Sequence, residues 1–208
     1  MKDCCEIRTD IPERQRRVLQ AVLSINSGMF VVEFGAGLLA HSTALLADAA
    51  DMLGDAIVYG FSLYAVARGG VWQARSALLK GLIMAGFGIV ILVEVALKIV
   101  RGVVPTADVM VGVGLVALMA NLFCLYLLWR RKGDDINMAS AWVCSRNDVV
   151  ANIGVLLAAS AVAVIGSAWP DIVVGVLIAA LFGSSAINVI RGARRELESA
   201  AETAGRTS

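Results

Sequence analysis

Six apolar segments, each long enough to cross a lipid bilayer, take up most of this sequence. A helix needs about 20 mostly apolar residues to span the hydrocarbon core. Because only helices and closed barrels satisfy their backbone hydrogen bonds in lipid, the sequence predicts an all-α membrane protein, a bundle of six transmembrane helices. The six windows are about 19–40, 47–67, 78–100, 107–129, 141–165 and 171–190.

The composition agrees with this fold class. The 208 residues are 59% hydrophobic and 17% charged, well below the roughly 25% of charged residues in a soluble domain. A net charge of +1 gives no basic surplus, so we expect no nucleic-acid partner. The four cysteines are too few and too scattered for a disulfide framework, and we interpret them as thiols.

Lysine and arginine residues favour one side of the membrane, which predicts the orientation of the chain. With the N-terminus inside, only Lys98 and Arg101 fall at the outer ends of the spans. We therefore expect both termini to be cytoplasmic, in a multi-pass protein of the cell inner membrane. Residues 1–18 and 192–208 would be short cytoplasmic segments on either side of a membrane domain, 19–191.

Three carboxylates interrupt the second span. At 100° per residue, Asp48, Asp51 and Asp55 fall within about 60° of one another and form one stripe. Insertion scales assign about 2.5–3.5 kcal/mol to each Asp near mid-membrane, so such residues normally face the bundle interior and mark an ion or proton path. A capping or purely structural role is reasonable for one Asp and weaker for a stripe of three.

The fifth span carries a matching face, with Cys144, Asp148 and Asn152 at steps of four. Two helices then each present an i, i+4 pair, and two facing pairs can complete four-coordination of one ion. Carboxylates suit hard or borderline dications, and a thiolate shifts the preference toward zinc or cadmium. The alternative for Cys144 is packing alone, as a small buried residue.

Other polar residues within the spans have two interpretations. Asn26 and Glu33, seven residues apart on the first span, share one face. Together with Asp48 and Asn152 they are candidates for the cation pathway or for proton coupling. For Asn26 and Glu33, a role as core hydrogen-bonding groups is an equal alternative.

Four further charged or titratable residues are predicted to lie outside the cation pathway. Arg146 lies about 160° around its helix from the Asp148 face, so we expect an ion pair with Glu33 or Glu94. Glu94 and Lys98 are an i, i+4 pair and a structural anchor. His41, the only histidine, is expected to be solvated in an outer loop.

At these residues the sequence resembles the cation diffusion facilitator family of divalent-metal transporters. The likeness rests on HSTALLADAADMLGD at the second span, NDVVANIGV on the fifth and SAWPDIVVGVLIAALF at the sixth. It implies proton-coupled efflux of a divalent metal by a protein that is not an enzyme and has no resident cofactor. The family's (H/D)xxxD quartet would be Asp51, Asp55, Cys144 and Asp148, with zinc or cadmium as the expected cation.

The sequence departs from the family pattern in three places. Cys144 stands where the family usually has His. The segment RRKGDDINMAS, with Asp134 and Asp135, stands where a His-rich loop would join spans four and five. Family members commonly continue into a cytoplasmic domain that binds metal and dimerises, whereas this sequence stops about 17 residues after position 191. We therefore expect any homodimer to be held mainly by membrane helices.

Other functions leave different signatures. An intramembrane aspartyl protease would need a GxGD motif, and Gly54-Asp55 follows Met52-Leu53. A proton-coupled carrier of small organic cations would need an aromatic cage near the stripe, and only Tyr59 and Phe61 are close. A non-transporting accessory subunit would have no affinity for metal. The adjacent thiols Cys4 and Cys5 lack the CxxC spacing of a structural zinc site, and a disordered tail is the favoured interpretation there.

Overall fold

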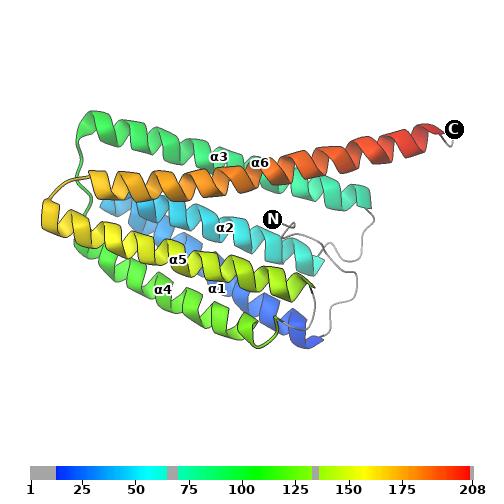
Figure 1. Cartoon of the computed structure of the whole chain (residues 1–208), viewed down its shortest axis with the longest axis horizontal. Helices are drawn as coiled ribbons and strands as arrows, with labels where there is room; N and C mark the ends of the chain where they lie inside the picture. The colour runs from blue at the N-terminus through cyan, green and yellow to red at the C-terminus, as the bar shows by residue number, and fades with distance from the viewer. Residues whose placement is uncertain (1–12, 65–69, 133–135, 207–208) are drawn as a thin grey trace.

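The computed structural model describes residues 13–64, 70–132 and 136–206, whose regular structure is entirely α-helical (Figure 1). This confirms the predicted all-α class. The bounds of the helices are α1 (Glu13–Ala40), α2 (Thr43–Tyr64), α3 (Gly70–Arg101), α4 (Ala107–Trp129), α5 (Ile136–Ile165) and α6 (Trp169–Arg206).

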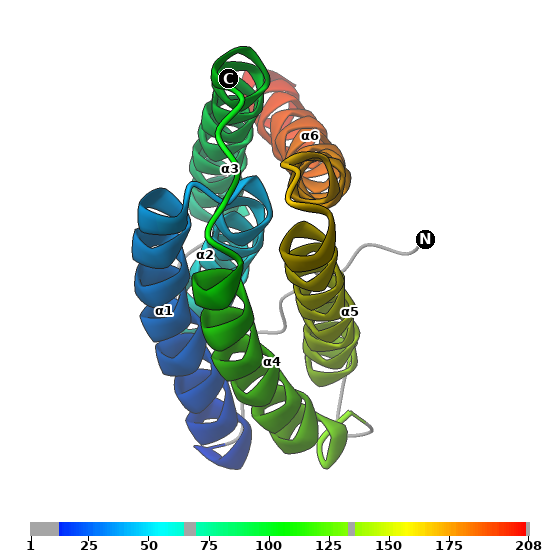
Figure 2. The ribbon, with the colours of Figure 1, turned by 90° about the vertical axis from the view of Figure 1, so that its left-hand side faces the viewer.

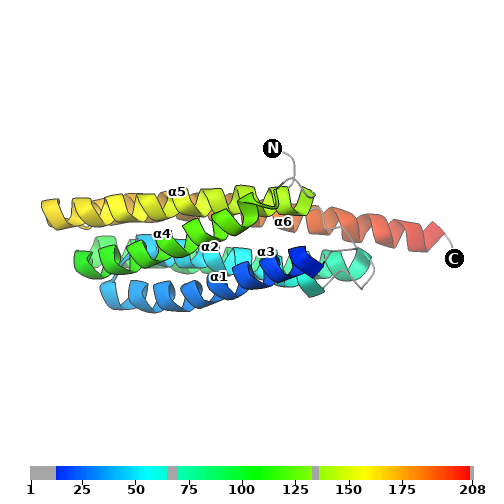
Figure 3. The same ribbon diagram turned by 90° about the horizontal axis from the view of Figure 1, so that it is seen from below.

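The helices run lengthwise and alternate in direction, so the bundle has two ends. One end, called here the His41 end, holds three connections: the turn after α1, residues 102–106 and residues 166–168. The start of α1 and the end of α4 lie at the other, the Arg130 end. α6 runs on past the other helices at the Arg130 end (Figures 1 and 3).

α2 occupies the middle of the bundle (Figure 2). It packs against α1, α3, α5 and α6, and the other extensive contacts join α3 to α6 and α4 to α5. The eight residues 43–50 at its start are all buried. The other helices therefore separate much of α2 from the surroundings of the bundle.

Five of the six helices in the described part of the chain are long and apolar enough to cross a membrane. Their outer faces carry large exposed apolar side chains such as Leu39, Val100 and Val164, each more than 80% exposed, which suits contact with lipid. α2 is the exception because three aspartates fall in every 18-residue stretch of it. Its central position explains how a helix with this charge fits a membrane bundle.

The helices extend beyond the apolar windows read from the sequence. α5 begins at Ile136 rather than at 141, and α6 continues to Arg206 rather than ending at 190. A hydropathy window detects only the part of a helix that lies in lipid, whereas a helix continues into water wherever its polar residues favour helical structure. The expected cytoplasmic tail, 192–208, is thus largely a continuation of α6.

Apolar clusters fill the bundle at several depths. The largest gathers small residues of α2, among them Ala44 and Ala47, against α4, α5 and α6. Leu19, Tyr59 and Leu128 belong to a second cluster, from α1, α2 and α4. Met29 and Met52 lie in a third, together with a buried alanine of α4. The aspartate stripe of α2 passes along this packed interior.

Candidate metal site

The three aspartates of α2 lie inside the bundle, as the helical spacing predicts. Asp48 is 1% exposed and Asp55 is 9% exposed, and Asp51 is partly buried. An uncompensated carboxylate in such surroundings is costly. The stripe therefore needs protons, hydrogen-bond donors or a cation to offset its charge.

The polar face of α5 is also turned inward. Asp148 is buried, and Cys144 is partly buried and forms no disulfide. The side-chain amide of Asn152 donates to the backbone carbonyl of Asp148 at 2.9 Å. The buried Oδ1 of Asn152 has no hydrogen-bond partner, so α5 presents an amide oxygen one turn from the carboxylate.

The acidic side chains of the two faces approach one another across the bundle. Asp148 on α5 lies within electrostatic range of all three aspartates of α2 and of Glu33, and like charges at that range repel one another. The hydroxyl group of Tyr59 interacts with Asp55, Cys144 and Asp148. The side chains that the sequence singled out on α2 and α5 therefore lie in one region, where α2 and α5 are in contact.

Tyr59 is a member of this region that sequence reasoning missed. Its buried hydroxyl donates to Oδ2 of Asp55 at 2.9 Å. The signal in the sequence was the i, i+4 spacing of Asp55 and Tyr59, which places both side chains on one helix face.

The described residues contain no group of three or more His, Cys, Asp or Glu side chains arranged to hold a metal ion. The four predicted ligands share a region, and coordination would need their side chains to draw closer together around an ion.

A second set of buried polar atoms extends from α1 toward Asp48. Glu33 is 0% exposed and interacts electrostatically with Asp48 and Asp51. Neither carboxylate oxygen of Glu33 has a hydrogen-bond partner, and the same holds for Oδ2 of Asp48, Oδ1 of Asn26 and both polar atoms of the Asn121 side chain. Buried polar atoms are normally paired, so this set is unusual.

The predicted ion pair of Arg146 with Glu33 or Glu94 is wrong. Arg146 is exposed, and its guanidinium lies 5.6 Å from the centroid of the Trp142 ring. Glu33 makes no hydrogen bond through either oxygen. A long basic side chain can reach along the helix and stack on an aromatic face instead of entering the bundle.

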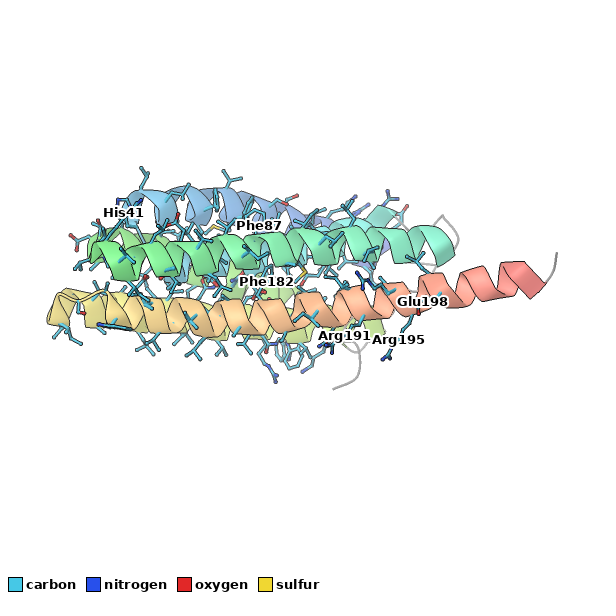
Figure 4. The ribbon with its side chains drawn as sticks, turned by 90° about the horizontal axis from the view of Figure 1, so that it is seen from above. His41, Phe87, Phe182, Arg191, Arg195 and Glu198 are labelled. Carbon is cyan, nitrogen blue, oxygen red and sulfur yellow. The ribbon has the colours of Figure 1, made fainter. Side chains whose placement is uncertain are left out.

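Lys98 has a stronger partner than the predicted Glu94. Its ammonium forms an ion pair with Asp171 of α6, N–O 2.5 Å, and both side chains are almost fully buried. A lysine within an apolar span requires a carboxylate nearby. The sequence does not identify Asp171 as that carboxylate, because only the fold brings α3 and α6 together. His41, at the same end of the bundle, is exposed as expected (Figure 4).

With this geometry in place, comparison with known proteins assigns the chain to a family. Residues 19–197 match the family described as the cation efflux transmembrane domain. This chain belongs to the cation efflux family, the cation diffusion facilitators. The match extends from α1 into α6 and so includes every helix of the bundle.

Similar proteins carry the names of metal transporters. The chain is 26% identical over 181 residues to the metal cation efflux system protein CzcD of Cupriavidus metallidurans, which covers 81% of this chain and 57% of CzcD. It is 26% identical over 195 residues to the zinc transporter ZitB of Escherichia coli, 88% of this chain and 62% of ZitB. A cadmium, cobalt and zinc/H(+)-K(+) antiporter of Bacillus subtilis is 22% identical over 191 residues, 85% of this chain and 61% of the antiporter.

The chain thus spans about three fifths of the length of these relatives. Membership in the cation efflux family and the apolar helices make it a multi-pass membrane protein. Two features of the sequence analysis, the thiols Cys4 and Cys5 and the loop carboxylates Asp134 and Asp135, lie outside the described residues.

Proposed function

We propose that this cation efflux protein exports a divalent transition metal across the inner membrane in exchange for protons. The observation that carries the proposal is that Asp148 on α5 and the aspartates of α2 lie in one buried region, where the two helices are in contact. A dication between the two helices would offset negative charge that lipid and apolar side chains cannot.

The proposed ligands are Asp51, Asp55, Cys144 and Asp148. α2 and α5 would each contribute an i, i+4 pair, the spacing that lets one helix reach an ion twice. Tyr59 would hold Asp55 through its hydrogen bond and so orient one ligand from outside the coordination sphere. The alternative for Cys144 is packing without coordination, as a small, partly buried residue.

The same carboxylates account for the proposed exchange with protons. Three aspartates and a thiolate would place four negative charges around a dication, so some must carry protons when the metal is absent. Metal binding then releases those protons. Glu33, Asp48, Asn26 and Asn152 are proposed to line the cation and proton pathway, because each has a buried oxygen without a hydrogen-bond partner.

Zinc and cadmium are the proposed cations. A set of three carboxylates and one thiolate suits borderline dications better than magnesium or manganese. The names of ZitB and of the Bacillus subtilis antiporter include zinc, and that of the antiporter includes cadmium. These names support the class of cation, and the thiolate is the feature of this chain that would set its preference.

We further propose that the His41 end faces the outside and that the transporter works as a homodimer held by its membrane helices. The Arg130 end carries exposed basic residues on three helices, among them Arg17, Arg130 and Arg191. The positive-inside rule places such an end in the cytoplasm. A carrier of small organic cations would need several aromatic rings facing the stripe, whereas Tyr59 contacts the stripe through its hydroxyl group, which donates to Asp55.

Calorimetric titration of the purified chain with cadmium tests the ligand set. The proposal predicts one cadmium ion per chain, and a loss of affinity of at least about tenfold in Asp51→Ala and in Asp148→Ala. Asp108→Ala is the matched control, because Asp108 is an exposed aspartate in the first turn of α4. Wild-type affinity in both site variants would refute this ligand set.

A further inference from the structure

Asp171 of α6 caps the start of a different helix, α2. Its carboxylate accepts hydrogen bonds from the hydroxyl groups of Ser42 and Thr43, both at 2.5 Å. The same carboxylate accepts the backbone N–H groups of Thr43 at 2.8 Å and Ala44 at 3.2 Å. The first N–H groups of a helix lack partners within it, so a carboxylate from α6 completes the N-terminus of α2.

Lys98 ties a third helix into the same contact. Its ammonium donates to Oδ2 of Asp171 and to the backbone carbonyl of His41, both at 2.5 Å. We call Ser42, Thr43, Lys98 and Asp171 the Asp171 cluster. It joins the α1–α2 turn, α3 and α6 at the His41 end, and every member is at most 5% exposed.

Backbone packing tightens the same junction. A Cβ added to Gly175, one turn after Asp171 on α6, would lie 2.8 Å from the backbone carbon of Thr43. Farther along α2, a side chain separates the two backbones, because a Cβ added to Gly54 would lie 2.9 Å from the Phe182 ring. Phe182 lies midway along α6 (Figure 4). α2 thus meets α6 backbone to backbone near its start and through a side chain at mid-length.

We propose that Asp171 is a positioning residue for transport, and that the Asp171 cluster is the fixed end about which α2 moves. This rests on the proposed function. A helix that is held at one end by its cap, by an ion pair and by backbone contact cannot turn about its axis or shift at that end. Its displacement during a tilt grows with distance from the clamp.

The clamp has a different consequence for each aspartate of the stripe. At 1.5 Å rise per residue, Asp48 lies about 7.5 Å from Thr43 along α2 and Asp55 lies about 18 Å away. A tilt about the cluster therefore moves Asp55 more than twice as far as Asp48. The ligands near Asp55 would separate from α5, whereas Asp48 would move less than half as far.

The opposing possibility is that the cluster is a gate that breaks in every cycle. A pocket of about 200 Å³ lined by His41, Thr43 and Lys98 borders the cluster, so water can approach it. The two possibilities make opposite predictions about distances. A fixed end keeps the outer ends of α2 and α6 at one separation, whereas a gate separates them.

Pulsed electron paramagnetic resonance on the full chain in lipid measures both separations. One pair of nitroxide labels would be placed at His41, in the turn that leads into α2, and at Trp169 at the start of α6, both of which are exposed. The other would be placed at Leu63 and Arg191, toward the Arg130 end. Non-canonical amino acids would carry the labels so that Cys144 is retained. Cadmium is predicted to shift the second distance distribution and to leave the first unchanged; a shift in the first, or in neither, would overturn the proposal.

Transport kinetics of Asp171→Asn and Lys98→Met provide the second measurement. Both variants are predicted to lower the maximal flux by about tenfold, which corresponds to about 1.4 kcal/mol in the barrier, with little change in cadmium affinity. The double variant should recover part of the flux, because neither buried charge is then unpaired. If the cluster only stabilised the fold, both variants would unfold at a lower temperature but would not combine a lower maximal flux with an unchanged cadmium affinity.

Glu94→Gln is the matched control for these variants. Glu94 lies on α3 one turn before Lys98 and lines the same pocket, but no hydrogen bond joins it to the Asp171 cluster among the described contacts. Its flux should equal that of the wild type. Wild-type flux in Asp171→Asn would refute the positioning role, whereas failure of the wild type to bind cadmium would refute the proposed function instead.

Discussion

At the scale of single residues, the hydrogen bond from Tyr59 to Asp55 gives the candidate site a contact that one substitution can remove. Tyr59→Phe removes the donor and keeps the ring. Loss of a group that orients a metal ligand typically costs about 10–100-fold in affinity, and we expect a loss near the lower limit, measured by cadmium titration. Tyr126→Phe, at an exposed position on α4, is the control. Equal affinity in both variants would remove Tyr59 from the site.

Cys144 decides which metals the site prefers. If its thiolate coordinates the ion, Cys144→Ser should weaken cadmium binding more than manganese binding, because a hydroxyl is a harder ligand. The wild type with bound cadmium should also show a thiolate-to-metal charge-transfer band in the ultraviolet. Bound cadmium without that band would leave Cys144 as a packing residue and favour harder metals.

The residues of the site differ in how far the sequence could predict them. The inward stripe on α2 and the matching face of α5 follow from helical periodicity, which needs no knowledge of neighbouring helices. The pairing of Lys98 with Asp171 joins residues 73 positions apart and depends on the contact between α3 and α6. For Arg146, periodicity correctly turned the side chain away from Asp148 but could not identify Trp142 as its neighbour.

At the scale of helices, the close approach of α6 to the start of α2 depends on a residue without a side chain. Gly175→Ala should lower the free energy of unfolding by about 1–3 kcal/mol, as overpacking does, because the new Cβ would meet the backbone of Thr43. The thermal midpoint should fall accordingly. Gly112→Ala, where a Cβ meets nothing within 4 Å, should leave the thermal midpoint unchanged or slightly raised. Thermal unfolding in detergent compares the two, and equal midpoints would contradict the tight α2–α6 contact.

Helix number and order were predictable because each apolar window reports its own helix. The depth of α2 in the bundle was less accessible, since a stripe of aspartates indicates one inward face but not that a helix is surrounded on several sides. Contacts with α1, α3, α5 and α6 supply that information. The ends of α5 and α6 were also missed, because they lie outside the apolar windows.

At the scale of the whole molecule, the distribution of basic residues predicts which end faces the cytoplasm. Cysteines introduced at His41 and at Arg195, both exposed, can be labelled on intact cells with a membrane-impermeant maleimide, in a variant whose four native cysteines are serines. The orientation proposed here predicts labelling at position 41 and labelling at position 195 only after lysis. The reverse pattern would invert the orientation.

Flux of zinc through proteoliposomes under an imposed pH gradient tests the central claim most directly. Zinc is expected to move in the direction opposite to the downhill flow of protons and to stop moving when a protonophore collapses the gradient. This flux should be lost in Asp51→Ala and Asp148→Ala but kept in Asp108→Ala. Zinc flux that is unchanged in Asp51→Ala and Asp148→Ala, or indifferent to the pH gradient in the wild type, would contradict the claim.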